Sequence, residues 1–450
     1  MIALPLSSHY SKFLPRFTRL ATVSIISNMM VPLAGICDTA FLGHLSDIRH
    51  LAGVILGGIL FDYLYRILKF FRNGTNAITA QAVGQNNPQQ VLLAVLRSAL
   101  VAGAIALLIL VLQYPIQRLG FGILSGSPDI EAMGIDYFNA RIWGAPAVLL
   151  NFVLIGWFLG QEKSGLVLAI SAIANGSNVL LDYIMINHWG WSSMGAGLAT
   201  ALSQYLALVV ALVGVAMSIN WRVLSSALPQ VLDWQALKST IILKGNILIR
   251  YLAMITAYSI FTNLSAGMGT EVIATNGLLL QIVLLSQFTV NGIGLTTQTL
   301  IGNFKGKGET EQMLPLLSVS MFTSLVIAIL FASISTLFPQ QILNLFTSHG
   351  NINQTAIAYI TWLLPLLSCG AIALILEGYV IGLKESAKLR NSALTALGLG
   401  FIPLAGFAWY FQSNHLLWLS LTSYMAILAI SLGVKIFGIQ SDRQPALQNQ

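Results

Sequence analysis

Charged residues are scarce in this chain of 450 residues. Asp, Glu, Lys and Arg together make up 8% of the sequence, and 56% of the residues are hydrophobic. Soluble domains carry about 25% charged residues, so a soluble fold of this length would lack the charges to cover its surface. The mean hydropathy of +0.79 agrees. The composition therefore predicts an integral membrane protein.

Cysteine and enzymatic motifs are also nearly absent. The two cysteines, Cys37 and Cys369, both fall inside predicted helices, where two thiols form neither a disulfide framework nor a metal cluster. The sequence contains no Walker loop, no His-Glu-x-x-His and no Gly-x-Ser-x-Gly motif. We therefore expect no enzymatic activity and no cofactor, and an ATP-driven pump would need a partner chain.

Long apolar runs recur along the whole chain, separated by short polar breaks. A helix needs about 20 mainly apolar residues to span a bilayer. The pattern predicts an all-α membrane protein with about twelve such helices. The predicted spans are 17–42, 52–78, 91–113, 132–158, 165–187, 195–218, 243–267, 272–298, 314–337, 356–381, 391–411 and 415–438.

The basic residues predict the orientation, because cytoplasmic loops carry an excess of Lys and Arg. With the N-terminus inside, the opposite side receives only Arg49 and Arg118 in its loops. Both termini are then cytoplasmic, and the net charge of +7 reflects topology and contact with anionic headgroups. Charges spread over many short loops argue against nucleic-acid binding. The cytoplasmic set is Lys12, Arg16, Lys163, Arg222, Lys238, Lys244, Lys305, Lys307, Lys384, Lys388, Arg390 and Arg443.

The two halves of the chain resemble each other, at offsets of 218 and 222 positions. Asn73-Gly74, Thr79 and Gly84 recur as Asn291-Gly292, Thr297 and Gly302, and Gly156, Gly160 and Ser164 recur as Gly378, Gly382 and Ser386. Six helices in each half give both halves the same orientation, which is a parallel repeat suited to alternating access. The predicted parts are a six-helix bundle over 1–219, a cytoplasmic linker over 220–245, a second bundle over 246–440 and a polar tail over 441–450.

Two aspartates stand inside predicted spans, Asp38 in the first and Asp182 in the fifth. An ionisable group at this depth costs roughly 2.5–3.5 kcal/mol by insertion scales, so it is a functional-site candidate. The alternative is a structural carboxylate that is neutral or paired with a neighbouring helix. We predict that both aspartates bind the coupling ion of a transporter.

Amide and hydroxyl side chains accompany these aspartates. Asn175, Asn178 and Asp182 share one helix face by their spacing. Oxygen ligands around a carboxylate suit a small cation, so Na⁺ could bind at Asp38, Asn178 and Asp182, but the same amides could instead hydrogen-bond a protonated aspartate. The further candidates are Asn151 and Thr200, which could alternatively serve only helix–helix contacts. The sequence leaves H⁺ and Na⁺ both open.

Other charges within predicted spans have no partner that the sequence identifies. Arg141, Arg250 and Glu377, together with the uncharged Asn291, are candidates for the lining of a substrate cavity. In the second span Asp62, Arg66 and Lys69 share a face, and an Asp62–Arg66 pair at i,i+4 would partly neutralise it. We interpret this face as structural or as lining a polar cavity.

The motifs together resemble the multidrug and toxic compound extrusion (MATE) family, in its DNA-damage-inducible-protein-F-like branch. The resemblance runs from about Pro15 to Lys435. The matching segments are Pro32–Leu45, Arg72–Thr75, Thr79–Gly84, Arg141–Pro146, Asn178 with Asp182, Gly195–Thr200, Arg250, Glu377–Gly378 and Arg390–Asn391.

The resemblance implies a two-bundle exporter of twelve helices that expels amphipathic, often cationic compounds in exchange for sodium ions or protons. It places Asp38, Asn151, Asn178, Asp182 and Thr200 at the family's cation-site positions. One departure concerns the eighth helix, where Asn291 stands in place of an acidic residue of many relatives.

The leading hypothesis is a secondary active exporter of small organic compounds in the bacterial inner or plasma membrane, and we expect it to be monomeric. One alternative is a flippase for lipids or polymer precursors on a related fold. The basic residues Arg66, Lys69 and Arg72 are compatible with the cationic groove that such a flippase would need. Another is a membrane scaffold that moves no substrate.

Overall fold

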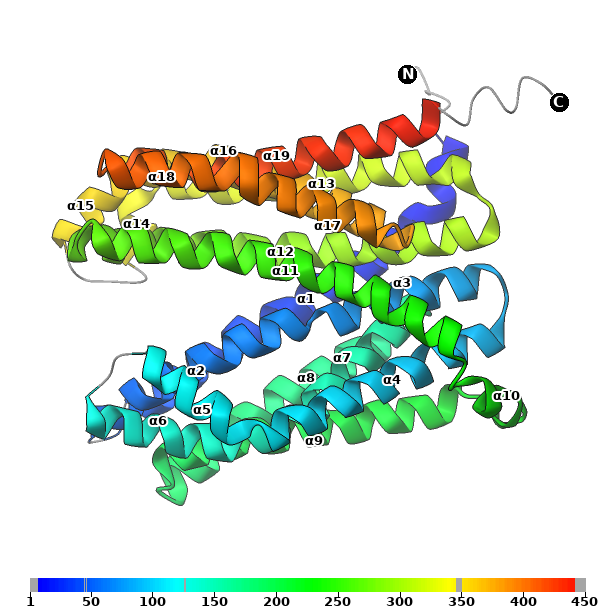
Figure 1. Ribbon diagram of the computed structural model, residues 1–450, viewed down its shortest axis with the longest axis horizontal. Helices are drawn as coiled ribbons and strands as arrows, with labels where there is room; N and C mark the ends of the chain where they lie inside the picture. Colours follow the sequence, from blue (N-terminus) through cyan, green and yellow to red (C-terminus); the bar gives the residue numbers. More distant parts are fainter. Residues whose placement is uncertain (1–6, 44, 46, 125–126, 345–349, 442–450) are drawn as a thin grey trace. The chain divides into compact units, whose positions relative to one another are not determined.

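The computed structural model describes residues 7–43, 45, 47–124, 127–344 and 350–441. Every regular element in these residues is helical (Figure 1). Within the described ranges, twelve helical segments are long and apolar enough to cross a membrane, as predicted. The predicted all-α membrane fold is confirmed, and most of the polar tail lies outside the described residues.

The helices have the following bounds. They are α1 (Ser7–Gly43), α2 (Ile48–Leu68), α3 (Phe70–Gly84), α4 (Pro88–Val111), α5 (Gln113–Ile123), α6 (Pro128–Arg141), η1 (Ile142–Gly144), α7 (Ala145–Gly160), α8 (Ser164–Asp182), η2 (Tyr183–His188), α9 (Ser192–Ser218), α10 (Trp221–Ala227) and η3 (Leu228–Gln230). Then follow α11 (Trp234–Gly267), α12 (Thr270–Lys307), η4 (Thr310–Gln312), α13 (Met313–Leu337), α14 (Pro339–Asn344), α15 (Gly350–Tyr359), η5 (Ile360–Trp362), α16 (Leu363–Gly382), α17 (Ser386–Thr395), η6 (Ala396–Phe401), α18 (Ile402–Tyr410) and α19 (Asn414–Ser441).

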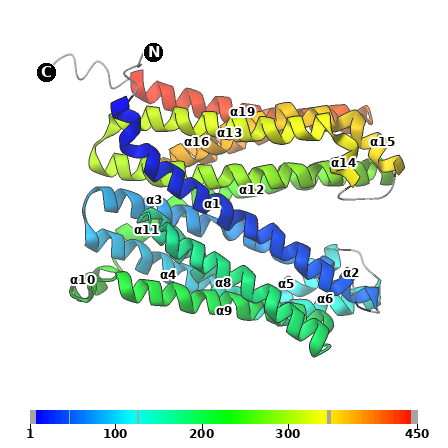
Figure 2. The ribbon, with the colours of Figure 1, turned by 180° about the vertical axis from the view of Figure 1, so that it is seen from behind.

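The chain divides into two compact units. One comprises residues Ile26–Ile242, here called the N-unit, and the other comprises Met1–Ile25 with Leu243–Gln450, here called the C-unit. In the N-unit α3 packs on α7, and in the C-unit α16 packs on α12, α13 and α19. In the N-unit α8 also packs on α9, as Figure 2 shows. The boundary at 242 falls inside the predicted linker, while the first residues of α1 group with the C-unit. The predicted division into domains stays a prediction.

Close helix packing repeats in the two units. A Cβ built on Gly156 of α7 would lie 2.3 Å from the Arg72 carbonyl oxygen of α3, and one on Gly378 of α16 would lie 2.4 Å from the Gly294 oxygen of α12. Only glycine allows backbones to approach so closely, as small residues do between membrane helices. The two contacts are 222 positions apart, which confirms the repeat.

The left-handed turns and the irregular helix segments follow the same repeat. Glu162 has a φ of 59° and Lys384, at the equivalent turn, a φ of 60°. A 3₁₀ segment precedes both α7 and α16, and a π-helix follows both α8 and α17. In α3 and α12, however, the packing offset is 222 rather than the 218 of the Asn-Gly motif. The motif alignment was therefore one helical turn out of register.

The second predicted span is not one continuous helix. The prediction was 52–78, whereas the segment in the structure runs over Arg49–Gly84 and is interrupted at Lys69, between α2 and α3. Among the described side chains no ion pair joins Asp62 to Arg66, so the expected neutralisation at i,i+4 is absent there. Asp62 is exposed instead.

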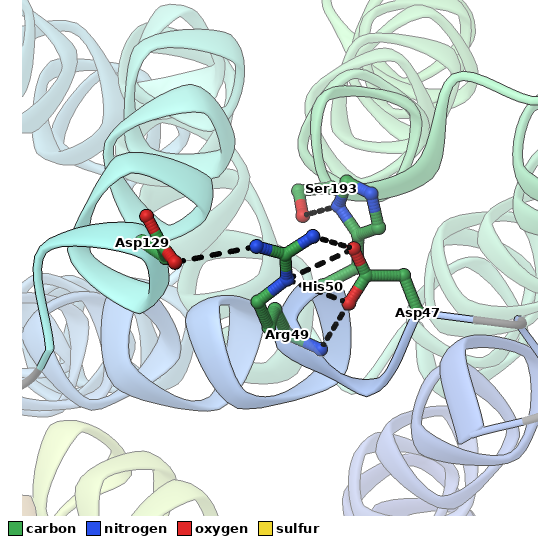
Figure 3. Close-up of polar contacts among 5 residues, drawn as sticks. All are labelled: Asp47, Arg49, His50, Asp129 and Ser193. Atoms are coloured by element: carbon green, nitrogen blue, oxygen red, sulfur yellow. Dashed lines mark hydrogen bonds and ion pairs between the residues drawn. The ribbon is translucent and has the colours of Figure 1, made fainter.

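A polar cluster ties the start of α2 to α6 and α9 (Figure 3). The Asp47 carboxylate caps α2 by accepting from the Arg49 backbone N–H, and it pairs with the Arg49 guanidinium at 2.7 Å. This pairing lowers the pKa of Asp47 to about 2. Arg49 also reaches Asp129 of α6 at 3.3 Å, and His50 Nδ1 lies 2.8 Å from the Ser193 hydroxyl of α9.

Candidate coupling site

The two predicted carboxylates come together in the N-unit. Asp38 lies on α1 and Asp182 is the last residue of α8, where the helix changes to π-helical winding. Their carboxyl groups interact directly with each other. Asp182 is fully buried and Asp38 is half-buried. The Oδ1 atom of each is buried and has no hydrogen-bond partner among the described residues.

Two like charges in direct contact away from water are strongly unfavourable, so a close carboxyl pair holds a proton or a cation between its members. A carboxyl pair with free oxygen atoms can therefore exchange one positive charge for another. This is the chemistry that a coupling site requires.

Asn178 and Thr200 complete a polar chain around Asp182. The Asn178 amide Nδ2 donates to Asp182 Oδ2 at 2.8 Å and to the Thr200 hydroxyl at 3.5 Å. The Thr200 hydroxyl in turn donates to the Ala196 carbonyl oxygen at 2.9 Å. Both neighbours of the amide thus present acceptors to it, and this pattern fixes its NH₂ group toward Asp182. The nitrogen of Asn178, rather than its oxygen, faces the carboxylate.

The other two predicted amides have different partners. Asn151 of α7 donates to Gln204 of α9, to the backbone oxygen at 2.9 Å and the side-chain oxygen at 3.2 Å. Gln204 is one helical turn beyond Thr200 on α9. Asn175 donates at 2.7 Å to the Ser171 carbonyl oxygen of its own helix. This hydrogen bond runs along α8 and not toward the carboxyl pair.

Arg141 lies close enough for its charge to act on both Asp38 and Asp182. It is the last residue of α6, followed by the 3₁₀ turn η1. Its guanidinium carbon is 4.6 Å from the centre of the Phe61 ring and 5.5 Å from that of Tyr137. The Arg141 Nη1 atom also donates to the Tyr137 hydroxyl. Arg141, which the sequence suggested for a substrate cavity, therefore acts electrostatically on the carboxyl pair.

The C-unit holds the other charged candidates in a closed arrangement. Arg250 of α11 contacts Glu377 Oε1 of α16 through Nε at 2.6 Å and through Nη2 at 2.5 Å. Both side chains are buried, with exposed fractions of 4% and 8%. The Arg250 guanidinium also lies 5.1 Å from the centre of the Tyr251 ring. Asn291 is half-buried on α12.

The sequence did not identify the aromatic residues around Arg141 or the role of Gln204. The signal for the former was the i,i+4 spacing of Tyr137 with Arg141 and of Phe61 with Tyr65, which places each pair on one helix face. Gln204 likewise follows Thr200 by four residues. None of these spacings indicates which helix faces which, so the sequence alone could not assign the contacts.

The MatE family model matches this chain twice, over residues 24–184 and 247–409. One match falls in each half of the chain, as do the equivalent helix contacts at Gly156 and Gly378. Together they cover most of its length, which shows the family directly.

Curated relatives and solved structures agree. The chain is 30% identical over 413 residues to DNA damage-inducible protein F of Escherichia coli K12, with 92% of this chain and 90% of that protein covered. It is 24% identical to a probable multidrug resistance protein NorM of Thermotoga maritima, covering 74% and 72% of the two chains. The fold matches an outward-facing multidrug resistance MATE family transporter of the MOP superfamily with a TM-score of 0.86, at 17% identity and 95% and 96% coverage. The chain therefore belongs to the MATE family of membrane transporters, in the branch of DNA damage-inducible protein F.

Proposed function

We propose that this protein is a secondary active exporter that exchanges small, amphipathic, often cationic organic compounds for H⁺ or Na⁺. One observation carries the proposal: carboxyl groups from α1 and α8 meet inside the N-unit, and each retains an oxygen without a partner in the described structure. Such a pair can bind one positive charge at a time, which is the competition that antiport needs.

In this proposal Asp38 and Asp182 bind the coupling ion, and Asn178 and Thr200 orient Asp182 by the hydrogen bonds described above. Asn151 and Asn175 support the surrounding helices. Arrival of the coupling ion removes one unit of negative charge from the pair and releases the organic cation, and loss of the ion restores the pair's affinity for the next substrate. The two units supply the two bundles of an alternating-access transporter.

The excess of basic residues in alternate loops supports cytoplasmic termini in a bacterial inner membrane. Glu377 is paired with Arg250 in the C-unit, so we assign the exchange of charge to the N-unit.

The test uses purified protein in liposomes loaded with a fluorescent organic cation, under a proton gradient or a sodium gradient imposed separately. We expect one gradient to drive efflux and both Asp38→Asn and Asp182→Asn to reduce it to the rate of empty liposomes. Asp129→Asn is the matched control, because it removes an exposed carboxylate from the same unit and should leave the flux unchanged. Absence of wild-type flux under both gradients would contradict the proposal, and lipid-linked substrates would then be the next to test.

A further inference from the structure

Arg141 lies in an aromatic cage within the N-unit. Its guanidinium carbon is 4.6, 5.5 and 5.9 Å from the ring centres of Phe61, Tyr137 and Tyr65, respectively. Cation–π attraction and the hydrogen bond to the Tyr137 hydroxyl hold the side chain in this position. Because α2 packs on α6, the cage is assembled by the core of the N-unit rather than by a loop.

The positive charge of Arg141 interacts electrostatically with both members of the carboxyl pair, Asp38 and Asp182. The other ionisable groups whose charges act on this cluster are Asp62, Tyr65 and Tyr137 near Arg141, and Cys37 near Asp182. In the described part of the chain, Arg141 is thus the cation that acts on both members of the pair.

Polar atoms in this cluster remain available for a further partner. Arg141 Nε, Asp38 Oδ1, Asp182 Oδ1 and the Tyr65 hydroxyl are all buried and have no hydrogen-bond partner among the described residues. Buried polar atoms in this state are rare and call for an explanation, of which a functional role is one. The four atoms belong to four different helices, so they mark a site rather than a local defect.

The hydrogen-bond pattern differs from that of a sodium site. Sodium, like other hard cations, binds several oxygen ligands. Here the Asn178 amide turns its NH₂ group toward Asp182 and Thr200, so its oxygen does not face the pair. The positive charge of Arg141, which acts on both carboxyl groups, would also oppose a sodium ion bound there. A proton needs only one oxygen, and it lets the two carboxyl groups hydrogen-bond to each other.

We propose that Arg141 is a specificity-determining residue: its caged guanidinium supplies the counter-charge that a metal ion would otherwise bring, so that the Asp38–Asp182 pair exchanges protons and rejects sodium. This inference rests on the proposed function and assigns its coupling ion. Arg141 does not bind the proton itself, but it sets which cation the pair accepts.

The first experiment measures sodium binding to the purified full-length protein, by calorimetry and by the shift in unfolding temperature in NaCl against choline chloride. We expect no sodium binding by the wild type. Arg141→Gln should gain sodium binding, with an affinity at least about tenfold above the detection limit that the wild type does not reach, equivalent to about 1.4 kcal/mol. The gain should disappear in the double variant Arg141→Gln with Asp182→Asn.

Two further variants separate charge from packing. Arg141→Lys keeps the positive charge and should remain insensitive to sodium even though its contacts with the rings differ. Arg222→Gln removes an exposed positive charge from the same unit and should also leave sodium binding absent. A structural role for Arg141 would change the unfolding temperature of both Arg141 variants without changing their response to sodium.

The sodium titration tests the inference about Arg141, and the flux assay separately tests the proposed function. Sodium binding by the wild type that Asp182→Asn abolishes would overturn the inference about Arg141, as would a folded Arg141→Gln that binds no more sodium than the wild type. If Arg141→Gln does not fold, Arg141→Met, which also removes the charge, takes its place in the titration, and sodium binding by the wild type would still overturn the inference. Failure of every gradient to drive flux would instead contradict the proposed function, while the sodium titration would remain interpretable.

Discussion

The two units treat buried charge in opposite ways. In the C-unit Arg250 contacts Glu377 directly at 2.5 Å, and the two charges cancel within one closed pair. In the N-unit Arg141 is surrounded by aromatic rings, while Asp38 and Asp182 face each other and retain unpartnered oxygens in the described structure. A repeated scaffold thus contains one closed ion pair and one open cluster.

Under the proposed function, this difference favours the N-unit as the one that exchanges ions. A closed pair of full charges is hard to enter, because any competing ion must replace a short hydrogen bond between ionised groups. An open cluster with one arginine and two carboxyl groups carries one unit of negative charge when both carboxyl groups are ionised. It is neutral once a single proton or cation is bound. We therefore expect substitutions in the C-unit pair to affect stability first and substitutions in the N-unit cluster to affect transport first.

The largest effect is expected from breaking the closed pair. Glu377→Gln leaves the buried Arg250 charge without its partner, which should destabilise the protein by about 3–5 kcal/mol. Replacing both members with methionine should restore most of that stability, because an apolar pair of similar volume needs no counter-charge. Thermal unfolding of the single and double variants measures both effects.

Asp182→Asn provides the contrast to that series. It should keep the unfolding temperature close to that of the wild type while abolishing coupled flux. A Glu377→Gln variant with unchanged stability and lost flux would reverse the roles that we assign to the two units.

The sequence predicted the twelve spans and the two intramembrane aspartates because both depend on one-dimensional signals. Hydropathy identifies a spanning helix without knowledge of its neighbours, and a carboxylate inside an apolar run is conspicuous wherever it packs. Asp38 and Asp182 were therefore found before any contact between α1 and α8 was known.

What the sequence could not give depends on contacts between distant segments. The ring of Phe61 on α2 contacts Arg141 on α6, and no local pattern links positions so far apart. The direction of the Asn178 amide depends on the Thr200 hydroxyl being engaged by Ala196. The offset of 218 inferred from the Asn-Gly motif was wrong for a related reason. A shift of four residues along a helix keeps a residue on nearly the same face, so the motif matched one turn away from the packing contact.

A smaller effect should come from the glycines that hold each unit together. Gly156→Ala and Gly378→Ala each place a methyl group within 2.4 Å of a backbone oxygen, so the helices must separate. Overpacking of this kind typically costs about 1–3 kcal/mol. Equal losses in unfolding temperature would show that the two contacts are equivalent. Gly176→Ala is the matched control, because nothing lies within 4 Å of its Cβ position, and a loss of the same size there would assign the effect to the substitution itself.

The smallest effect should separate the equivalent turns at Glu162 and Lys384. Both residues have left-handed backbones, with φ of 59° and 60°, a strain of about 1 kcal/mol that glycine relieves.

Burial and the nearby Lys305 charge lower the pKa of Lys384 to about 8. Below that pH the folded protein must keep a charged lysine partly buried, and this penalty disappears as the pH rises from 8 toward the ordinary lysine value of 10.5. Lys384→Gly should therefore raise the unfolding temperature more than Glu162→Gly at neutral pH, and the excess should vanish near pH 10.5. An excess that is independent of pH would assign the difference to packing at the turn and not to the buried charge.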